Sequence, residues 1–163
     1  EEKTPAEEEK KTKFTPDQEK QREKQKMDSL IQQTDRVLIK VKTVFPFVLF
    51  PNTLYIDENK ISYIDYEFFF TKYIRNILLA NVAEVKVSTV PFFATLTITD
   101  MSFDRRQEIK VPFLWKQDAV DVEHIIQGMI LARKEGLDLS KFSITELREK
   151  IKELGNIRGE PLV

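Results

Sequence analysis

The sequence contains no cysteine, one histidine and only four glycines among its 163 residues. The absence of cysteine excludes a disulfide scaffold, a thiolate nucleophile and any cysteine-ligated zinc or iron–sulfur site. A single histidine excludes a metal site built from several histidines, and four glycines provide little material for a phosphate-binding loop. We therefore expect neither a cofactor nor a metal.

The net charge is also small, and the hydrophobic runs are short. The 26 basic and 27 acidic residues give a formal net charge of -1, so no overall positive field attracts nucleic acid. The longest apolar stretch, Val44 to Phe50, is interrupted by Pro46. It is far shorter than the ~20 residues that a membrane-spanning helix needs. We expect a soluble, cytoplasmic protein, with association to a membrane as the alternative.

Residues 1–35 differ from the rest of the chain. Within residues 1–26 there are eight acidic and eight basic residues, and only Ala6 and Phe14 are apolar. Such a segment buries too little surface to offset the entropy of ordering it. Residues from Asp17 to Gln33 favour helix. We predict a disordered tail that continues into a fraying helix and tethers the domain that follows.

From Arg36 onward the pattern becomes that of β-strands. Thr95, Thr97 and Thr99 alternate with apolar residues, the period of two expected of a strand with one buried face. Seven such segments, separated by turn residues, predict an antiparallel sandwich or barrel rather than parallel βαβ units. The predicted strands are Val37 to Phe45, Thr53 to Asp57, Lys60 to Tyr66, Lys72 to Leu79, Val82 to Thr89, Phe93 to Thr99 and Gln107 to Leu114.

The last third of the chain has helical periodicity. Asp118 is the expected N-cap of a first helix, and Gly136 is the expected residue just after its end. The apolar stripe of this helix has the i, i+3, i+4, i+7, i+8 spacing that covers a core. It consists of Val122, Ile125, Ile126, Met129 and Ile130.

A second, shorter helix is predicted over residues 143–154. Ser143 and Glu146 have the spacing of a capping box, and the apolar stripe that follows is narrow. A helix this short is marginal alone, so it must dock either on its own domain or on another subunit. The stripe consists of Ile144, Leu147, Ile151 and Leu154.

Seven short strands followed by an amphipathic helix resemble the element order of bacterial pleckstrin-homology-like (PH-like) domains. Asn52 to Ile64 looks like their opening hairpin, Tyr73 to Val87 resembles the following strand pair, and Phe93 to Ile98 lies where the next strand comes. The resemblance covers roughly residues 37–135. The chain departs from this family in lacking a glycine-rich fourth turn and in its extra apolar strand, Val37 to Phe45.

The resemblance implies a seven-stranded antiparallel barrel or sandwich capped by an amphipathic helix, at residues 36–136. Residues 137–163 would form a C-terminal extension with the short helix. PH-like domains are binding modules for lipid headgroups or peptides, or assembly domains, and have no catalytic residues of their own. Fold analogy does not choose among these uses.

Aromatic runs provide the candidate partner-binding surface. Successive side chains of an extended segment point to opposite faces, and a two-layer domain buries only one of them. Exposed aromatic clusters commonly mark interaction surfaces. The candidate residues are Tyr66, Phe68, Phe69 and Phe70, unless a turn rotates the phenylalanines into the core. Trp115, between the last strand and the helix, is expected to plug the end of the barrel.

These features predict a non-enzymatic module that serves as a protein–protein adaptor or assembly domain, bound to another protein or to a second copy of itself. A sheet edge and the last helix are further expected contacts. His124, with Asp121 and Glu123 nearby, is interpreted as a boundary residue rather than a catalytic base. The alternative function is peripheral binding to anionic lipid through Phe68–Phe70. Its expected headgroup ligands are Lys72, Arg75, Arg105 and Arg106.

Overall fold

The computed structural model describes residues 20–25, 27, 36–68, 71–102 and 105–156. The chain divides into two compact units, Glu1–Gln32 and Gln33–Val163. In the first unit, residues 20–25 and 27 are helical and exposed, within the helix predicted from Asp17 to Gln33. The rest of the predicted tail lies outside the described residues.

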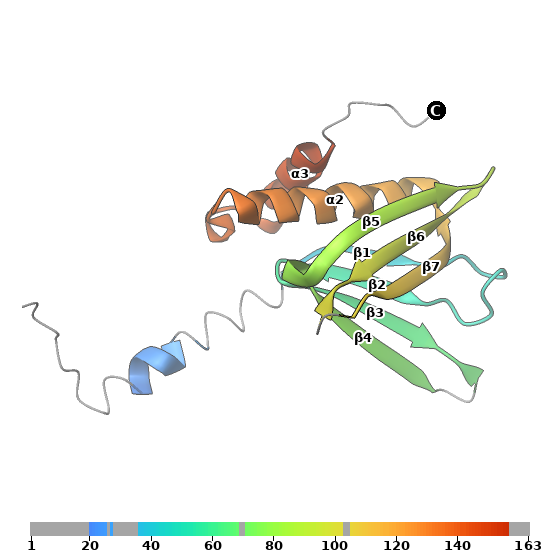
Figure 1. Ribbon diagram of the computed structural model, residues 1–163, viewed down its shortest axis with the longest axis horizontal. Coiled ribbons are helices and arrows are strands. Elements are labelled where there is room, and N and C mark those ends of the chain that lie inside the picture. Colours follow the sequence, from blue (N-terminus) through green and yellow to red (C-terminus); the bar gives the residue numbers. More distant parts are fainter. Residues whose placement is uncertain (1–19, 26, 28–35, 69–70, 103–104, 157–163) are drawn as a thin grey trace, which may run out of the picture. The chain divides into compact units, whose positions relative to one another are not determined.

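The described part of the second unit contains seven strands in two antiparallel sheets, with orders β1-β2-β3-β4 and β5-β6-β7 (Figure 1). The mainly β prediction is confirmed, and the predicted strand ends differ from the observed ones by three residues at most. The strands are β1 (Val37–Lys42), β2 (Thr53–Asp57), β3 (Lys60–Tyr66), β4 (Lys72–Leu78), β5 (Val82–Thr89), β6 (Phe93–Asp100) and β7 (Gln107–Trp115).

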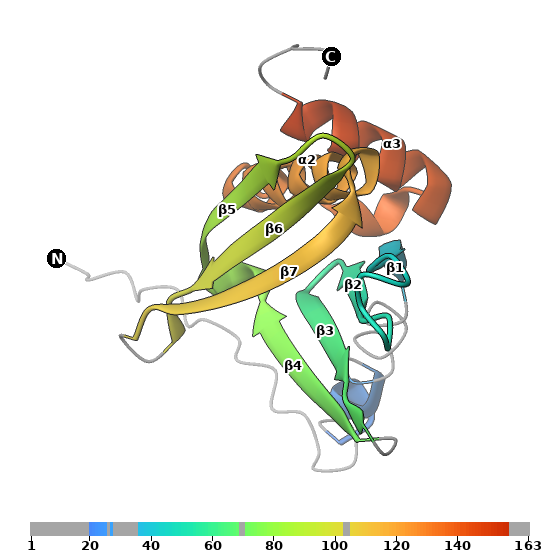
Figure 2. The same cartoon turned by 90° about the vertical axis from the view of Figure 1, so that its right-hand side faces the viewer.

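The strands follow the predicted alternation because each sheet has one face on the core. In β6, Ala94, Leu96 and Ile98 are buried, whereas Thr95 and Thr97 lie on the outer face and are half-exposed. Neighbouring side chains of a strand point to opposite faces, so this pattern places every second residue in the core. The two sheets diverge, and Figure 2 shows them with the helices beside the gap.

Helix α2 (Lys116–Lys134) covers the open side between the sheets, where it packs against β5, β6, β1 and β7. Its predicted apolar stripe faces the core. The predicted N-cap at Asp118 is wrong: the chain passes directly from β7 into the helix, so Trp115 is the N-cap and Asp118 lies in the first turn. Gly136 has the predicted role, with a positive φ of 64° just after the helix end.

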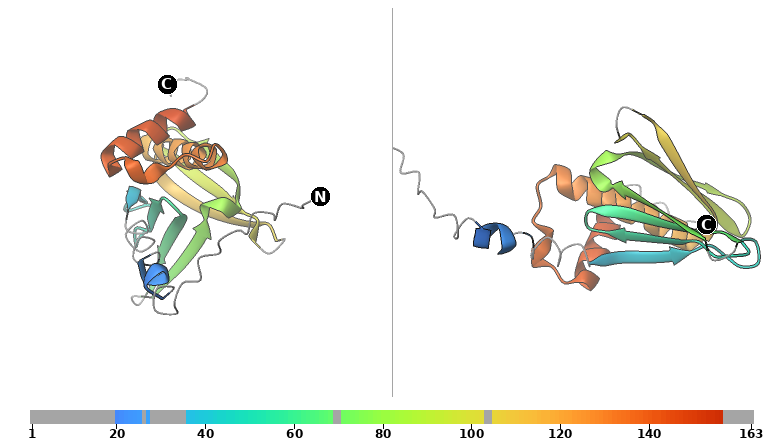
Figure 3. Two further views of the ribbon diagram at one scale, coloured as in Figure 1. Left: turned by 90° about the vertical axis from the view of Figure 1, so that its left-hand side faces the viewer. Right: turned by 90° about the horizontal axis from the view of Figure 1, so that it is seen from below.

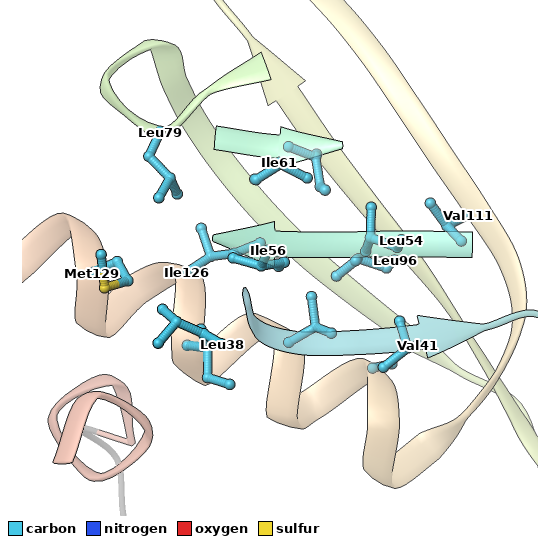
Figure 4. Packing of buried hydrophobic residues seen from close by; sticks show 14 of the residues in the cluster. Leu38, Val41, Leu54, Ile56, Ile61, Leu79, Leu96, Val111, Ile126 and Met129 are labelled. Carbon is cyan, nitrogen blue, oxygen red and sulfur yellow. The ribbon is translucent and has the colours of Figure 1, made fainter. Parts of the chain in front are cut away.

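The core lies where α2 meets the two sheets (Figure 4). Ile126 and Met129 of α2 pack in one cluster with Leu38 and Ile56 of the first sheet and Leu96 of the second. Each fully buried side chain of this size contributes roughly 1.5–3 kcal/mol relative to an exposed one. The helix therefore holds the two sheets together through the same cluster.

Helix α3 (Ile144–Gly155) docks on α2 of its own chain, as the left view in Figure 3 shows. The Ser143 hydroxyl accepts a hydrogen bond from the Glu146 N–H at 3.3 Å, the predicted cap. The helices approach closely because Gly128 and Gly155 have no side chains. A Cβ at Gly128 would collide with the Ile151 carbonyl, and a Cβ at Gly155 would collide with the backbone of α2.

Docking on α2 buries only part of the narrow apolar stripe of α3. Leu147 and Ile151 are buried, whereas Ile144 and Leu154 remain exposed. Short 3-10 turns also connect elements: η2 (Leu79–Asn81) lies between β4 and β5, and η4 (Leu139–Lys141) lies between the helices.

Candidate functional site

The loop between β1 and β2 (residues 43–52) carries no charged residue. Two hydrogen bonds join its ends: the Thr43 N–H donates to the Asn52 carbonyl at 3.0 Å, and the Asn52 N–H donates to the Thr43 hydroxyl at 2.8 Å. The residues between these ends project from the strands, on the right in Figure 1. The loop therefore presents apolar side chains on a base whose backbone is already paired.

Asn52 also fixes this loop to β3. Its side chain is buried, its Nδ2 donates to the Tyr63 hydroxyl at 2.8 Å, and its Oδ1 accepts the Tyr66 N–H at 2.9 Å. Burial raises the pKa of Tyr63, and the nearby Asp65 carboxylate adds to the rise, so the phenol stays protonated. Both ends of the Asn52 amide are thus used to position the loop.

Phe113 interrupts the regular pairing of β7 with β6. The register shifts between Ala94 and Leu96, which leaves one extra residue on β7. Phe113 has a φ of 53°, a conformation that costs a residue with a side chain roughly 1–3 kcal/mol. Its carbonyl accepts the Val44 N–H at 2.8 Å. The bulge therefore holds the β1–β2 loop against the second sheet.

Aromatic rings from three segments meet beside this bulge. The ring centroid of Phe93 lies 4.7 Å from that of Phe47 and 5.4 Å from that of Trp115. Phe113 lies stacked against Phe47 at 5.6 Å. Aromatic pairs in such arrangements contribute ~0.5–1.5 kcal/mol beyond the burial of their area. The rings therefore form an ordered surface rather than independent side chains.

The same loop makes a second ring contact, since Phe50 and Phe68 meet edge-on at 5.6 Å. The β5–β6 turn adds Val90 and Phe92 next to Phe93. We call the whole surface the aromatic end. Nine of its side chains are exposed by 38% to 74%, and only Phe93 is more covered. The aromatic end consists of Phe45, Phe47, Leu49, Phe50, Phe68, Val90, Phe92, Phe93, Phe113 and Trp115.

The aromatic end is unusual in having no charge of its own. None of its three main segments, residues 43–52, 90–93 and 113–115, contains a charged residue. Soluble monomers rarely expose contiguous apolar patches larger than a few hundred Å², and larger ones mark protein or membrane contacts. The arrangement is suited to binding an apolar surface.

Only part of the predicted partner-binding set can be placed. Tyr66 and Phe68 are exposed, and Phe68 belongs to the aromatic end. Phe69 and Phe70 lie outside the described residues. The predicted role of Trp115 is wrong: its side chain is 52% exposed beside Phe93 and does not plug the structure, because Leu114 takes the buried position.

The predicted lipid-binding residues do not gather at one place. Lys72 pairs in register with Tyr66 near the aromatic end, and Arg75 lies farther along β4. Arg105 and Arg106 precede β7 and therefore lie at the end of that strand opposite Trp115. Arg106 is also engaged, since its Nη2 lies 3.3 Å from carboxylate oxygens of both Glu84 and Glu108.

Sequence reasoning missed most of the aromatic end because its segments are far apart in the chain. Of this surface, the predicted partner-binding set includes only Phe68, whereas the apolar stretch Val44 to Phe50 was considered only as too short to span a membrane. A signal was present, since residues 43–52 combine three phenylalanines with two prolines and no charge.

The other end of the unit carries buried charge. Arg36 Nη1 lies 2.9 Å from Glu58 Oε1, and these side chains are 16% and 8% exposed. Arg36 also donates to the carbonyl of Phe142, while Arg133 donates to the Glu58 carbonyl and the Asn59 side chain, both at 2.6 Å. We call these five residues the charged end. Burial raises the pKa of the Glu58 carboxyl, and Arg36 opposes this rise.

No catalytic arrangement surrounds His124 in the part of the chain that the structure describes. Its side chain is half-buried on α2 and makes no hydrogen bond or ion pair with a described residue. Asp121 binds Lys152 at 2.7 Å and the Gln117 amide at 2.8 Å, so it serves packing between α2 and α3. Burial, helped by Asp121, raises the pKa of Asp118.

No group of three or more acidic or histidine side chains among the described residues is arranged to hold a metal ion. No helix among them is long and apolar enough to cross a membrane.

Comparisons with protein families, curated proteins and solved structures found no match for this chain. They neither support nor contradict the PH-like resemblance of residues 37–135. The aromatic end is therefore interpreted from its own exposure, ring contacts and charge.

Proposed function

We propose that this chain is a non-enzymatic binding module of PH-like fold that attaches to a membrane surface by inserting its aromatic end. One observation carries the proposal: eight exposed apolar side chains gather at one end of the strands, in three segments without a single charge, and Phe68 adds a ninth. Of the two functions considered from sequence, membrane attachment now has the stronger support.

The PH-like assignment is supported by topology. Sheets of four and three antiparallel strands, in chain order, are followed by a helix that packs against both. This matches the element order of the resemblance. Of the extra apolar strand Val37 to Phe45, residues 37–42 form β1, and residues 43–45 begin the β1–β2 loop that contributes to the proposed binding surface.

The shape of the aromatic end favours a bilayer over a protein groove. Its side chains project on loops and strand ends, and aromatic residues prefer the interface between headgroups and acyl chains. The backbone at the base of the loop is paired through Thr43 and Asn52, which lowers the cost of entering an apolar medium. Burying a phenylalanine side chain fully yields roughly 1.5–3 kcal/mol, so a few partly inserted rings suffice for reversible attachment.

Flotation with lipid vesicles tests this function. The Leu49→Asp/Phe92→Asp variant places two charges on side chains that are 59% and 74% exposed, so the fold is expected to be unaffected. We expect binding to vesicles of phosphatidylcholine and phosphatidylserine to fall by at least about 10-fold, because aspartate strongly opposes entry into the bilayer.

The matched control is Met101→Asp/Leu137→Asp, which adds the same charge at side chains 49% and 54% exposed outside the aromatic end. It should bind vesicles nearly as well as the unaltered chain. Equal losses in both variants would show a general effect of charge, and failure of the unaltered chain to float would reject membrane attachment.

A second candidate, assembly of this chain with itself or another protein, is favoured by β4. This strand lies at the edge of its sheet and exposes Tyr73, Ile74 and Leu78 by 52% to 56%. Edge strands with exposed apolar residues readily pair with a further strand. Concentration-dependent association in sedimentation that Ile74→Lys abolishes, without vesicle binding, would establish this function instead.

A further inference from the structure

On the outer face of the β5-β6-β7 sheet, the chemical type of the side chains changes from one row to the next along the strands. Because β5 and β7 both pair with β6, residues at the same level form rows across the sheet. From the aromatic end inward, the rows are Phe93 with Trp115, Ser88 with Thr95, Lys86 with Thr97 and Lys110, and Glu84 with Thr99 and Glu108. Aromatic, hydroxyl, cationic and acidic side chains thus follow one another.

These rows belong to one surface. In β6 the alternate residues Leu96 and Ile98 are fully buried, so Thr97 between them points outward. Lys86 and Lys110 share the level of Thr97 and are exposed. Two strand spacings of ~4.8 Å place their Cα atoms about 10 Å apart, on either side of the central strand.

The two lysines are available to an external anion. Neither forms an ion pair with a described residue, whereas Glu84 and Glu108 in the next row are both bound by Arg106 at 3.3 Å. The acidic row is therefore partly neutralised within the sheet, and the unpaired positive charge lies nearer the aromatic end. The chain as a whole has a net charge of -1, so any attraction to anions must arise from such a local pattern.

The spacing of the rows fits the layers of a bilayer surface. Four residues at ~3.3 Å separate Phe93 from Thr97, so the lysine row lies about 13 Å from the aromatic row. Long lysine side chains extend toward the headgroups while their stems follow the protein surface. With the rings among the acyl chains, the hydroxyl row would meet the interface and the lysines the lipid phosphates.

We propose that the outer face of the β5-β6-β7 sheet contacts the lipid headgroups when the aromatic end is inserted, and that Lys86 and Lys110 select anionic phospholipids. This inference rests on the proposed insertion of the aromatic end. It assigns headgroup recognition to residues other than the four expected from sequence. Lys72 lies close in sequence to Asp65 and Glu67, which reduces the positive field on that side. Lys42 and Lys116 flank the aromatic end and add to its attraction for anions.

The test compares vesicles of phosphatidylcholine alone with vesicles that also contain phosphatidylserine, at low and high salt. The full chain should bind the anionic vesicles more tightly, and salt should remove the difference. Lys86→Gln/Lys110→Gln should weaken binding to anionic vesicles about 30-fold, from ~1 kcal/mol for each lysine near the surface. Its binding to neutral vesicles should not change.

The matched control is Lys134→Gln/Lys150→Gln, which removes the same charge from α2 and α3, away from this face. It should retain at least most of the preference for anionic vesicles. Equal binding of the unaltered chain to neutral and anionic vesicles would overturn the lysine assignment while leaving insertion intact. Equal losses in the two double variants would also overturn it. Failure to bind either kind of vesicle would reject both proposals.

Discussion

The two ends of the folded unit use their side chains in opposite ways. At the aromatic end, nine apolar side chains are exposed, and residues 43–52, 90–93 and 113–115 contain no charge. At the charged end, Arg36 and Glu58 are largely buried and paired at 2.9 Å, with Arg133 tying the β2–β3 turn to α2. Buried ions and exposed rings are each unfavourable unless something compensates them.

The compensation differs between the ends. The charges of the charged end are paired within the chain, because guanidinium groups lie against the Glu58 carboxylate and donate to backbone carbonyls of Glu58 and Phe142, in two separate segments. The aromatic end is only partly covered by its own ring contacts. We infer that the charged end serves stability and that the aromatic end serves binding, so substitutions at the two ends should have different consequences.

The largest expected effect on stability is at the charged end. Glu58→Ala should lower the free energy of unfolding by about 2–4 kcal/mol, because it leaves the Arg36 guanidinium without its carboxylate in a poorly solvated position. Urea unfolding measures this change. Glu84→Ala is the matched control, since Arg106 and Glu84 are both more than half exposed, and it should cost less than about 1 kcal/mol. Similar losses of unfolding free energy in both variants would contradict the claim that the buried Arg36–Glu58 pair contributes more to stability than the exposed Arg106–Glu84 pair.

A smaller effect concerns pH. Burial raises the pKa of folded Glu58 above its ordinary value of 4.5, which applies in the unfolded chain. Between these two pKa values the folded state binds more protons, so the free energy of unfolding should fall as pH rises through this window. Glu58→Gln removes this contribution. Unfolding curves of both proteins across the window should differ in slope, and parallel curves would contradict the raised pKa.

The smallest expected effect on stability is at the aromatic end. Phe92 is 74% exposed, so Phe92→Ser should change the free energy of unfolding by no more than about 0.5 kcal/mol. Thermal unfolding provides the measurement. A loss as large as that of Glu58→Ala would mean that Phe92 supports the fold, and the contrast between the two ends would disappear.

Much of the fold was predictable from local pattern. The alternation in β6 and the stripe of α2 predict the buried faces because side-chain direction repeats every 2 residues in a strand and about every 3.6 in a helix. The cap at Ser143 and the helix end at Gly136 depend on neighbouring residues only. Asp118 was misplaced as a cap because the strand before it runs straight into the helix, which no local preference reveals.

The candidate site was less predictable, for a physical reason. Phe47, Phe93 and Trp115 lie far apart in the chain, and their ring contacts depend on the register of β6 with β7 and on the bulge at Phe113. Neither register nor bulge is encoded in a single segment. The pairing of Arg36 with Glu58 is equally non-local, and the even charge composition of the chain conceals it.

The sequence by itself determined which segments become strands and helices and which of their faces are apolar, because these depend on spacing along the chain. The sequence also determined that residues 43–52, 90–93 and 113–115 carry no charge. Only the tertiary structure decided that three such segments meet at one end, that Arg105 and Arg106 lie at the other end of their strand, and that Lys86 and Lys110 share a row. Those placements follow from strand register and from the packing of α2 between two sheets, which couple residues distant in sequence.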